Sequence, residues 1–248
     1  MHSSVKRVAH GLHSLAQRFL VQDWRVHRLQ EERHLARLLR DLRVDCVFDV
    51  GANVGMYAKM LREYCGYTGY IVSFEPTPAT FDRLVKNCSA DRKWRGFNCG
   101  LGATSGTLTL HDNPGNSEGN SFLAWNSTSD RPTDSIEVEV KTLSSLFPAL
   151  QAELGFRRPF LKMDTQGFDL QVFEGASEFH AAFVGLQSEL ALSPFYDGAP
   201  DWNESLSRYR EAGFALSALI ANNAFYPEIQ EVDCVMLRPA CFERPGAR

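Results

Sequence analysis

The chain has 248 residues, of which 44% are hydrophobic and 23% charged, and this composition is typical of a soluble globular protein. No apolar run approaches the roughly 20 residues that a membrane-spanning helix needs, and no apolar segment of the kind found in secretory signals follows the basic N-terminus. The six cysteines form no Cys-x-x-Cys pair. We therefore expect free thiols in a reducing, cytoplasmic compartment, without a disulfide framework or a zinc site.

Charge is distributed unevenly along the chain. Residues 1–43 carry nine basic and four acidic side chains, a net charge of +5, and the rest carries 17 basic and 26 acidic ones, a net charge of −9, which sum to −4. The acidic body argues against nucleic acid as a partner, because phosphate binding needs clustered Lys and Arg.

The basic N-terminal segment has the apolar periodicity of a helix over residues 8–42. We predict a basic amphipathic helical arm over residues 1–43 and one domain over residues 44–248. The favoured interpretation is that the arm packs on this domain or on a second copy of the chain. Peripheral contact with an anionic membrane surface is the alternative.

Short β-like runs alternate with helical runs from residue 44 onward. In chain order, the pattern predicts strands at 44–50, 70–74, 95–99, 107–111, 136–141, 159–163, 184–190, 214–220 and 232–237, and helices at 54–64, 77–87, 168–179 and 204–212. This alternation is typical of a parallel α/β sheet with crossover connections. No convincing helix joins the last two strands, so we expect an antiparallel hairpin at one edge.

The strongest local motif follows the first predicted strand, where residues 49–55 read Asp-Val-Gly-Ala-Asn-Val-Gly. Gly51 and Gly55 allow a sharp turn and the close approach of a ligand, at the position where nucleotide-like ligands bind open α/β sheets. The motif lacks the Gly-Lys-Ser/Thr of a phosphate-binding loop, and Asn53 replaces the second glycine of the dinucleotide motif. Asp49 instead favours a positively charged ligand.

A carboxylate ends the second predicted strand. Glu75 lies twenty residues after Gly55, in the sequence Ser-Phe-Glu-Pro. At this spacing a carboxylate accepts hydrogen bonds from the ribose hydroxyls of an adenosine moiety. Together with the glycine turn, Glu75 predicts an adenosine site.

These motifs, with others further along, resemble those of the FkbM-type methyltransferases. The further ones are Leu-Lys-Met-Asp-Thr-Gln-Gly-Phe-Asp (161–169), Phe-Glu-Gly-Ala (173–176), Leu-Gln-Ser-Glu-Leu (186–190) and Val-Asp-Cys-Val-Met (232–236). The resemblance implies a class I, Rossmann-like methyltransferase fold with a seven-stranded sheet whose last strand is antiparallel. It also implies methyl transfer from S-adenosylmethionine to a hydroxyl of a sugar, glycolipid or related secondary metabolite.

The resemblance also implies a cofactor site. Residues of the 49–55 motif would bind the methionine part of S-adenosylmethionine, Glu75 its ribose, and the end of the third strand its adenine. No acidic residue is present near that third strand to accept from the adenine amino group, so the backbone or Asn98 must serve there. The predicted cofactor-binding residues are Asp49, Gly51, Asn53, Gly55, Glu75, Asn98, Gly100 and Asp164.

Asp164 and Glu189 end two later strands and should lie at the same sheet edge as the cofactor turn. Either the pair ligates a divalent cation, or Asp164 is the general base for the acceptor hydroxyl. We favour the metal-free version, because Gln166 leaves the local acidic cluster thinner than a dedicated cation site would prefer. The resemblance places Glu at this position in many relatives, so a role for an acid there does not carry over. Lys162 should point to the same side as Asp164 and complete the catalytic candidates, whereas Asp169 is expected to face outward.

The segment 107–141, with His111, Asn120, Ser121 and Trp125, is the predicted acceptor pocket, although His111 is more readily explained as structural than as a base. Two other functions remain open. One is a nicotinamide-dependent oxidoreductase, against which the missing Gly-x-Gly-x-x-Gly and Tyr-x-x-x-Lys motifs argue. The other is a non-catalytic adenosine-binding scaffold, which the four acidic positions 49, 75, 164 and 189 make less attractive.

Overall fold

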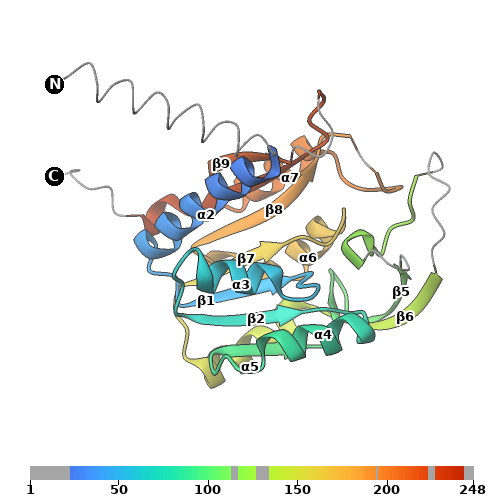
Figure 1. Ribbon diagram of the computed structural model, residues 1–248, viewed down its shortest axis with the longest axis horizontal. Helices are drawn as coiled ribbons and strands as arrows, with labels where there is room; N and C mark the ends of the chain where they lie inside the picture. Colours follow the sequence, from blue (N-terminus) through green and yellow to red (C-terminus); the bar gives the residue numbers. More distant parts are fainter. Residues whose placement is uncertain (1–22, 113–116, 127–133, 194, 223–226, 243–248) are drawn as a thin grey trace, which may run out of the picture.

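Seven strands form one sheet across the molecule, in the order β3-β2-β1-β7-β8-β10-β9 (Figure 1). The computed structural model describes residues 23–112, 117–126, 134–193, 195–222 and 227–242. The strands of this sheet are β1 (Cys46–Val50), β2 (Tyr70–Phe74), β3 (Trp94–Phe97), β7 (Pro159–Met163), β8 (Gly185–Ala191), β9 (Ala215–Asn222) and β10 (Glu231–Leu237).

The strands pair in parallel except for β10. This last strand is antiparallel both to β8 and to β9, and it lies between them. The predicted class I methyltransferase arrangement, a mostly parallel seven-stranded sheet with an antiparallel hairpin at one edge, is therefore confirmed. Strand β1 pairs with β2 on one side and with β7 on the other, so the order of the strands reverses next to β1. We call this point the division at β1. In such sheets, ligands bind in a crevice at the carboxyl ends of the strands beside it.

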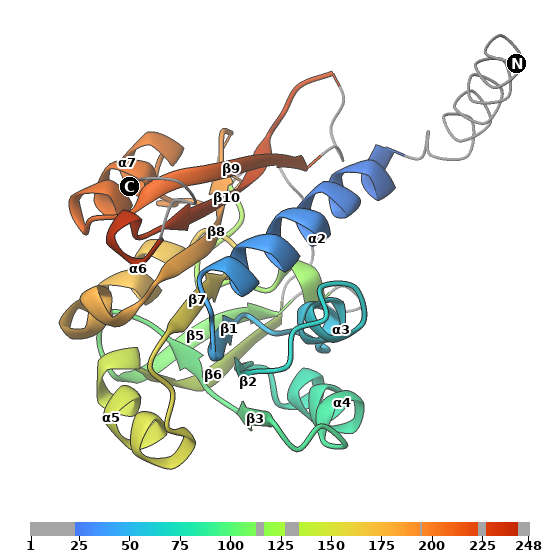
Figure 2. The ribbon, with the colours of Figure 1, turned by 90° about the vertical axis from the view of Figure 1, so that its left-hand side faces the viewer.

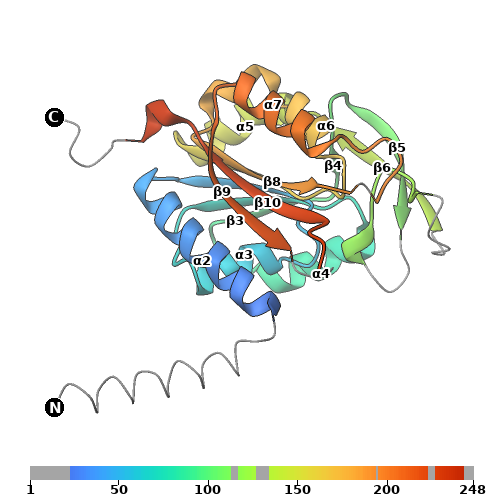
Figure 3. The same cartoon turned by 90° about the horizontal axis from the view of Figure 1, so that it is seen from above.

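Helices cover both faces of the sheet (Figures 2 and 3). One face carries α2 (Asp23–Asp41), α3 (Met56–Glu63) and α4 (Pro78–Cys88), and the other carries α5 (Leu143–Leu154), α6 (Asp169–Glu174) and α7 (Trp202–Glu211). Each face has its own buried apolar core. All six cysteines are free, as predicted, and Cys46, Cys99 and Cys234 are buried. In the part of the chain that the structure describes, every helix is too short or too polar to cross a membrane.

The sequence analysis did not predict helix α5. A proline inside a helix removes one backbone hydrogen bond, and Pro148 lies within this one. Burial of four apolar side chains at three- and four-residue intervals outweighs that loss, and the Thr142 hydroxyl caps the helix by accepting from the Ser145 N–H. The buried side chains are those of Leu143, Phe147, Leu150 and Leu154.

The helix predicted at 168–179 is shorter than expected. It ends at Glu174, and a 3-10 helix (Ser177–Ala182) follows. A Cβ atom on Gly175 would lie 2.0 Å from the carbonyl oxygen of Gly102. Only glycine therefore allows the chain to pass this close to Gly102 as it leaves α6.

The described part of the N-terminal arm packs on the body. Helix α2 contacts β9 and α3, and its apolar stripe forms part of the core on that face. The stripe consists of Leu35, Leu38, Leu39 and Leu42, all buried. The first half of the predicted arm lies outside the described residues, so its contact with a membrane or a second copy stays a prediction.

We expect Leu42→Ala to lower the free energy of unfolding by about 2–5 kcal/mol, because a fully buried leucine leaves a cavity. Leu29→Ala, on the same helix but 45% exposed, is the matched control and should cost little. Urea unfolding of the two variants measures the difference. Equal stability of both would mean that α2 is not part of the folded core.

A second, three-stranded sheet follows the order β4-β6-β5. Its strands are β4 (Gly100–Leu101), β5 (Gly106–Asp112) and β6 (Asp134–Lys141). The strands predicted at 107–111 and 136–141 therefore exist. They pair with each other. They lie beyond one end of the large sheet, the end toward which the arrowheads of β2 and β7 point (Figure 1).

Candidate active site

A cavity of about 570 Å³ opens at the carboxyl ends of the parallel strands. Its lining comes from both sides of the division at β1, namely from the turns after β1 and β2 on one side and from β7, β8 and β10 on the other. The segment 117–125 contributes a further wall. This volume is within the range of small-molecule sites.

The glycine turn after β1 brings the two sides together. Gly51 has a φ of +74°, and a Cβ atom there would lie 1.9 Å from the carbonyl oxygen of Asp164. Only glycine allows the turn to pass this close to the end of β7. Gly55, with a φ of +89°, begins α3 and packs against Cys88, so it does not line the cavity.

Glu75 lies at the cavity end of β2 and is only 6% exposed. One carboxylate oxygen accepts the N–H of Asn53 at 3.0 Å and the other accepts the N–H of Thr77 at 2.9 Å. Burial raises the pKa of Glu75, and these two N–H groups oppose the rise. A hydrogen bond from the Thr77 side chain also lowers its pKa. Since a carboxylate offers about four acceptor positions, Glu75 can still accept a hydrogen bond from a ligand.

Besides Gly55, two other predicted cofactor residues do not reach the cavity. Asn98 is exposed, and its amide donates to the carbonyl oxygens of Glu75 and Pro76 at 2.9 Å and 3.1 Å. Asp49 is completely buried beneath the cavity, and the positive charge that it attracts is the chain's own Lys162. Gly100, by contrast, lines the cavity as expected.

Lys162 connects Asp49 with the cavity. Its Nζ lies 3.2 Å from Asp49 Oδ1 and 3.5 Å from Asp164 Oδ2, and it donates to the Gly51 carbonyl at 3.3 Å. Burial disfavours the charged ammonium, but the Asp49 and Asp164 carboxylates outweigh it and raise the pKa of Lys162. The predicted placement of Lys162 beside Asp164 is confirmed.

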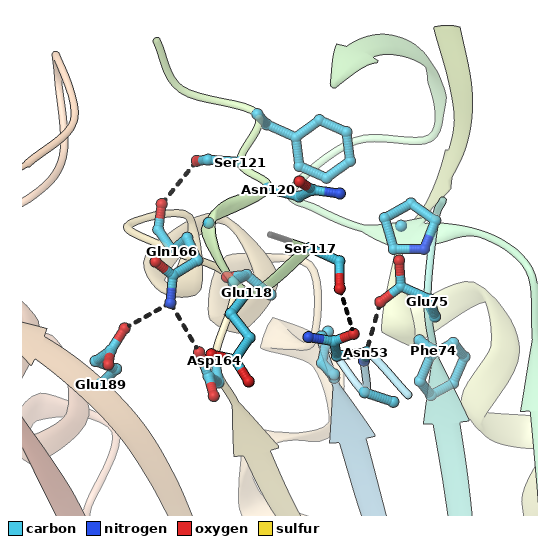
Figure 4. Close-up of a pocket in the computed structure, with 18 of the residues that line it drawn as sticks. Asn53, Phe74, Glu75, Ser117, Glu118, Asn120, Ser121, Asp164, Gln166 and Glu189 are labelled. Atoms are coloured by element: carbon cyan, nitrogen blue, oxygen red, sulfur yellow. Dashed lines mark hydrogen bonds between the residues drawn. The ribbon is translucent and has the colours of Figure 1, made fainter. Parts of the chain in front are cut away.

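Asp164 and Glu189 both line the cavity, and the structure joins them through Gln166. The Gln166 amide nitrogen donates to Asp164 Oδ1 at 3.2 Å and to Glu189 Oε2 at 3.0 Å (Figure 4). Burial first and the Asp164 charge second raise the pKa of Glu189 well above its ordinary value. On the next strand, burial and Asp164 raise the pKa of Glu231 to about 7. The cavity therefore has a distinctly acidic side.

The expectation that Asp169 faces outward is wrong. Its side chain is 3% exposed and accepts four hydrogen bonds: from the Thr165 N–H and hydroxyl, the Ser188 hydroxyl and the Glu189 N–H. Asp169 thus ties the start of α6 to β8 directly below the two cavity carboxylates. The Ser188 hydroxyl, 19 residues away in sequence, supplies a bond that no local pattern reveals.

The structure places only part of the predicted acceptor segment at the cavity. Asn120, Ser121 and Trp125 line the cavity, whereas His111 lies on β5 outside it. The sequence analysis missed Tyr57, whose hydroxyl donates to Gln187 Oε1 at 2.9 Å and whose ring lies on the cavity wall. The signal in the sequence that could have identified Tyr57 is its position near the start of α3.

The described residues include no group of three or more His, Cys, Asp or Glu side chains arranged to hold a metal ion. A divalent cation held by Asp164 and Glu189 is tested by chelation.

Comparisons with known proteins identify the family. The family model for the methyltransferase FkbM domain matches residues 49–216. Hexuronic acid methyltransferase AglP of Haloferax volcanii is 30% identical over 167 residues, which cover 64% of this chain and 64% of that protein. Methyltransferase sdnD of Sordaria araneosa is 30% identical over 165 residues, which cover 56% of this chain and 62% of that protein. The chain thus covers less than two thirds of each relative's length.

Among solved structures, magnesium protoporphyrin IX methyltransferase from Synechocystis PCC 6803 aligns with a TM-score of 0.47 and 9% identity, over 88% of this chain and 84% of that one. The family match over residues 49–216 includes the glycine turn, Glu75 and both cavity carboxylates of β7 and β8. The chain belongs to the FkbM family of methyltransferases.

Proposed function

We propose that this protein is an S-adenosylmethionine-dependent O-methyltransferase that methylates a hydroxyl of a sugar or a related hydroxylated acceptor. The observation that carries the proposal is that one cavity contains Glu75 on the β2 side and Asp164 with Glu189 on the other. The first can hold an adenosine moiety and the second an acceptor. The name of the Haloferax volcanii relative, a hexuronic acid methyltransferase, supports a sugar acceptor.

The residues present fit the cofactor. The Glu75 carboxylate, which lines the cavity, suits a ribose hydroxyl. The turn at Gly51 offers a surface without a side chain, where the methionine part of the cofactor can approach the backbone. Gly100 and Leu101 line the cavity at the place where the adenine ring is expected.

S-adenosylmethionine supplies an activated methyl group, so the protein's task is chiefly alignment. In the proposal, the side chains of β7 and β8 orient the acceptor hydroxyl. The Asp164 carboxylate would accept the hydroxyl proton as the hydroxyl oxygen takes the methyl group and the carbon–sulfur bond breaks, which leaves S-adenosylhomocysteine. The nearby Lys162 ammonium would stabilise the carboxylate before the transfer.

Calorimetry with S-adenosylmethionine and with NADH separates this proposal from an oxidoreductase. We expect binding of the first and none of the second. Turnover of labelled S-adenosylmethionine with a panel of glycosides and glycolipids then separates an enzyme from an adenosine-binding scaffold.

The panel should contain a glucuronide and the matching neutral glucoside, because methylation of a carboxylate would also consume the cofactor. A methyl ether survives mild alkali and a methyl ester does not. Label that is lost in alkali, or binding of NADH alone, would contradict the proposal.

A further inference from the structure

Gln166 makes several polar contacts at the acidic side of the cavity, and both polar atoms of its amide are used. The nitrogen donates to Asp164 and Glu189, and the oxygen accepts the hydroxyl of Tyr196 at 2.8 Å. The Gln166 backbone carbonyl accepts the Ser121 hydroxyl at 2.7 Å. The side chain and backbone of Gln166 therefore connect the turn after β7 with β8, Tyr196 and Ser121; Figure 4 shows the contacts with Asp164, Glu189 and Ser121.

The charges around the amide determine its orientation. If the amide were turned over, its oxygen would face two carboxylate oxygens at about the present 3.0 Å and 3.2 Å, and the nitrogen would face a hydroxyl instead. Ionised carboxylates only accept hydrogen bonds. The Tyr196 hydroxyl lies 2.8 Å from Oε1 and 3.3 Å from the Gly119 carbonyl oxygen, two acceptors for its one hydrogen, so the two carboxylates determine the orientation.

The backbone at Gln166 is also unusual, with a φ of +53°. A residue other than glycine in this left-handed region is uncommon, and asparagine adopts it more readily than glutamine does. The chain thus keeps a longer side chain than the backbone prefers. Only the longer one spans from the turn after β7 to Glu189 on β8 while also reaching Tyr196.

We propose that Gln166 is a positioning residue whose amide fixes the orientation of the Asp164 and Glu189 carboxylates at the acceptor end of the cavity without adding a charge. This inference rests on the proposed function, in which Asp164 receives the hydroxyl proton. The neutral amide matters because most groups around it are acidic. The titratable or charged groups that face this region are Arg28 and Glu31 from α2, Lys162 from β7, Asp164 from the turn after it, Asp169 from α6, Glu189 from β8, Glu231 and Asp233 from β10, Glu118 from the segment 117–125, and the phenols of Tyr57 and Tyr196.

The first test is Gln166→Asn, which keeps the amide and suits the backbone but is one methylene shorter. We expect kcat to fall by about tenfold, the effect of losing a hydrogen bond to a charged group, while calorimetry finds S-adenosylmethionine affinity within about twofold of wild type. If the backbone conformation were the only role of the residue, kcat would be unchanged, and that result would overturn the proposal.

The second test, Gln166→Glu, places a new carboxyl group between two existing ones. Its pKa in the folded protein should exceed the roughly 4.3 of an unfolded glutamate. The variant should therefore match wild type in stability below that pH and lose stability progressively as the pH rises above it. The acidic limb of its kcat profile should also move to higher pH by about one unit.

Gln171→Glu is the matched control, because it adds the same charge five residues away at an exposed position of α6. Urea unfolding without cofactor, between about pH 4 and pH 8, should separate the two variants. This range starts near the ordinary pKa of a carboxyl group. Identical pH dependence in both would overturn the proposal. A wild type that transfers no methyl group would instead refute the proposed function, and the unfolding comparison would still test the Gln166 contacts.

Discussion

Asp164→Asn should lower turnover by about 100-fold or more while leaving S-adenosylmethionine affinity nearly unchanged. The substitution keeps the shape of the side chain but removes its negative charge and its capacity to accept a proton. Asp164 lies between the Lys162 ammonium and the Gln166 amide, both of which are placed to bind a carboxylate rather than an amide. Single-turnover kinetics with calorimetry of cofactor binding measures the two effects separately.

Asp197→Asn is the control for Asp164→Asn, because Asp197 is exposed and outside the cavity. Adding EDTA to the wild type then distinguishes the two roles of Asp164. Loss of activity that magnesium or manganese restores would assign Asp164 and Glu189 to a cation site. Activity that EDTA does not affect would leave Asp164 as the base. Wild-type turnover by Asp164→Asn would exclude both roles.

Glu75→Ala should weaken S-adenosylmethionine binding by at least about tenfold, since hydrogen bonds to a charged acceptor are worth ~1.5–3 kcal/mol. The variant also removes the acceptor of the Asn53 and Thr77 N–H groups, which loosens the turn after β1. Calorimetry measures the affinity, and Glu63→Ala, on the exposed side of α3, is the control.

A variant that removes only the charge separates these two contributions of Glu75. Glu75→Gln keeps most of the shape, so a similar loss of affinity in Gln and Ala variants would attribute the effect to the carboxylate. Unchanged affinity in both would remove Glu75 from the cofactor site.

Local patterns predicted the parts of the fold that depend on local chemistry. Strand β2 was predicted at residues 70–74, as observed, because a short apolar run ends at a glutamate followed by proline. Helix α5 was missed because Pro148 is an unfavourable helix residue whose cost is offset by burial on the sheet. Helix propensity depends on the local sequence, whereas burial depends on the tertiary structure.

The site, like the fold, was predictable where it depends on local motifs. The glycine turn, Glu75 and the two strand-end carboxylates follow from motifs at strand ends, where the topology brings them to one edge. Asp169 and Asn98 were misplaced because their partners are fixed by tertiary structure. Asp169 binds Ser188 on another strand, and Asn98 binds backbone carbonyls after β2.

The insertion of β10 between β8 and β9 limits how the protein can be divided. The segment that matches the family, 49–216, ends within β9 and omits both β10 and α2. A protein cut to that segment would expose the unpaired edge of β8 and the apolar face that the leucines of α2 cover. Such edges pair with other chains, so an insoluble or inactive product from this segment would carry no information about catalysis. Tags and fusion partners belong outside residues 23–242.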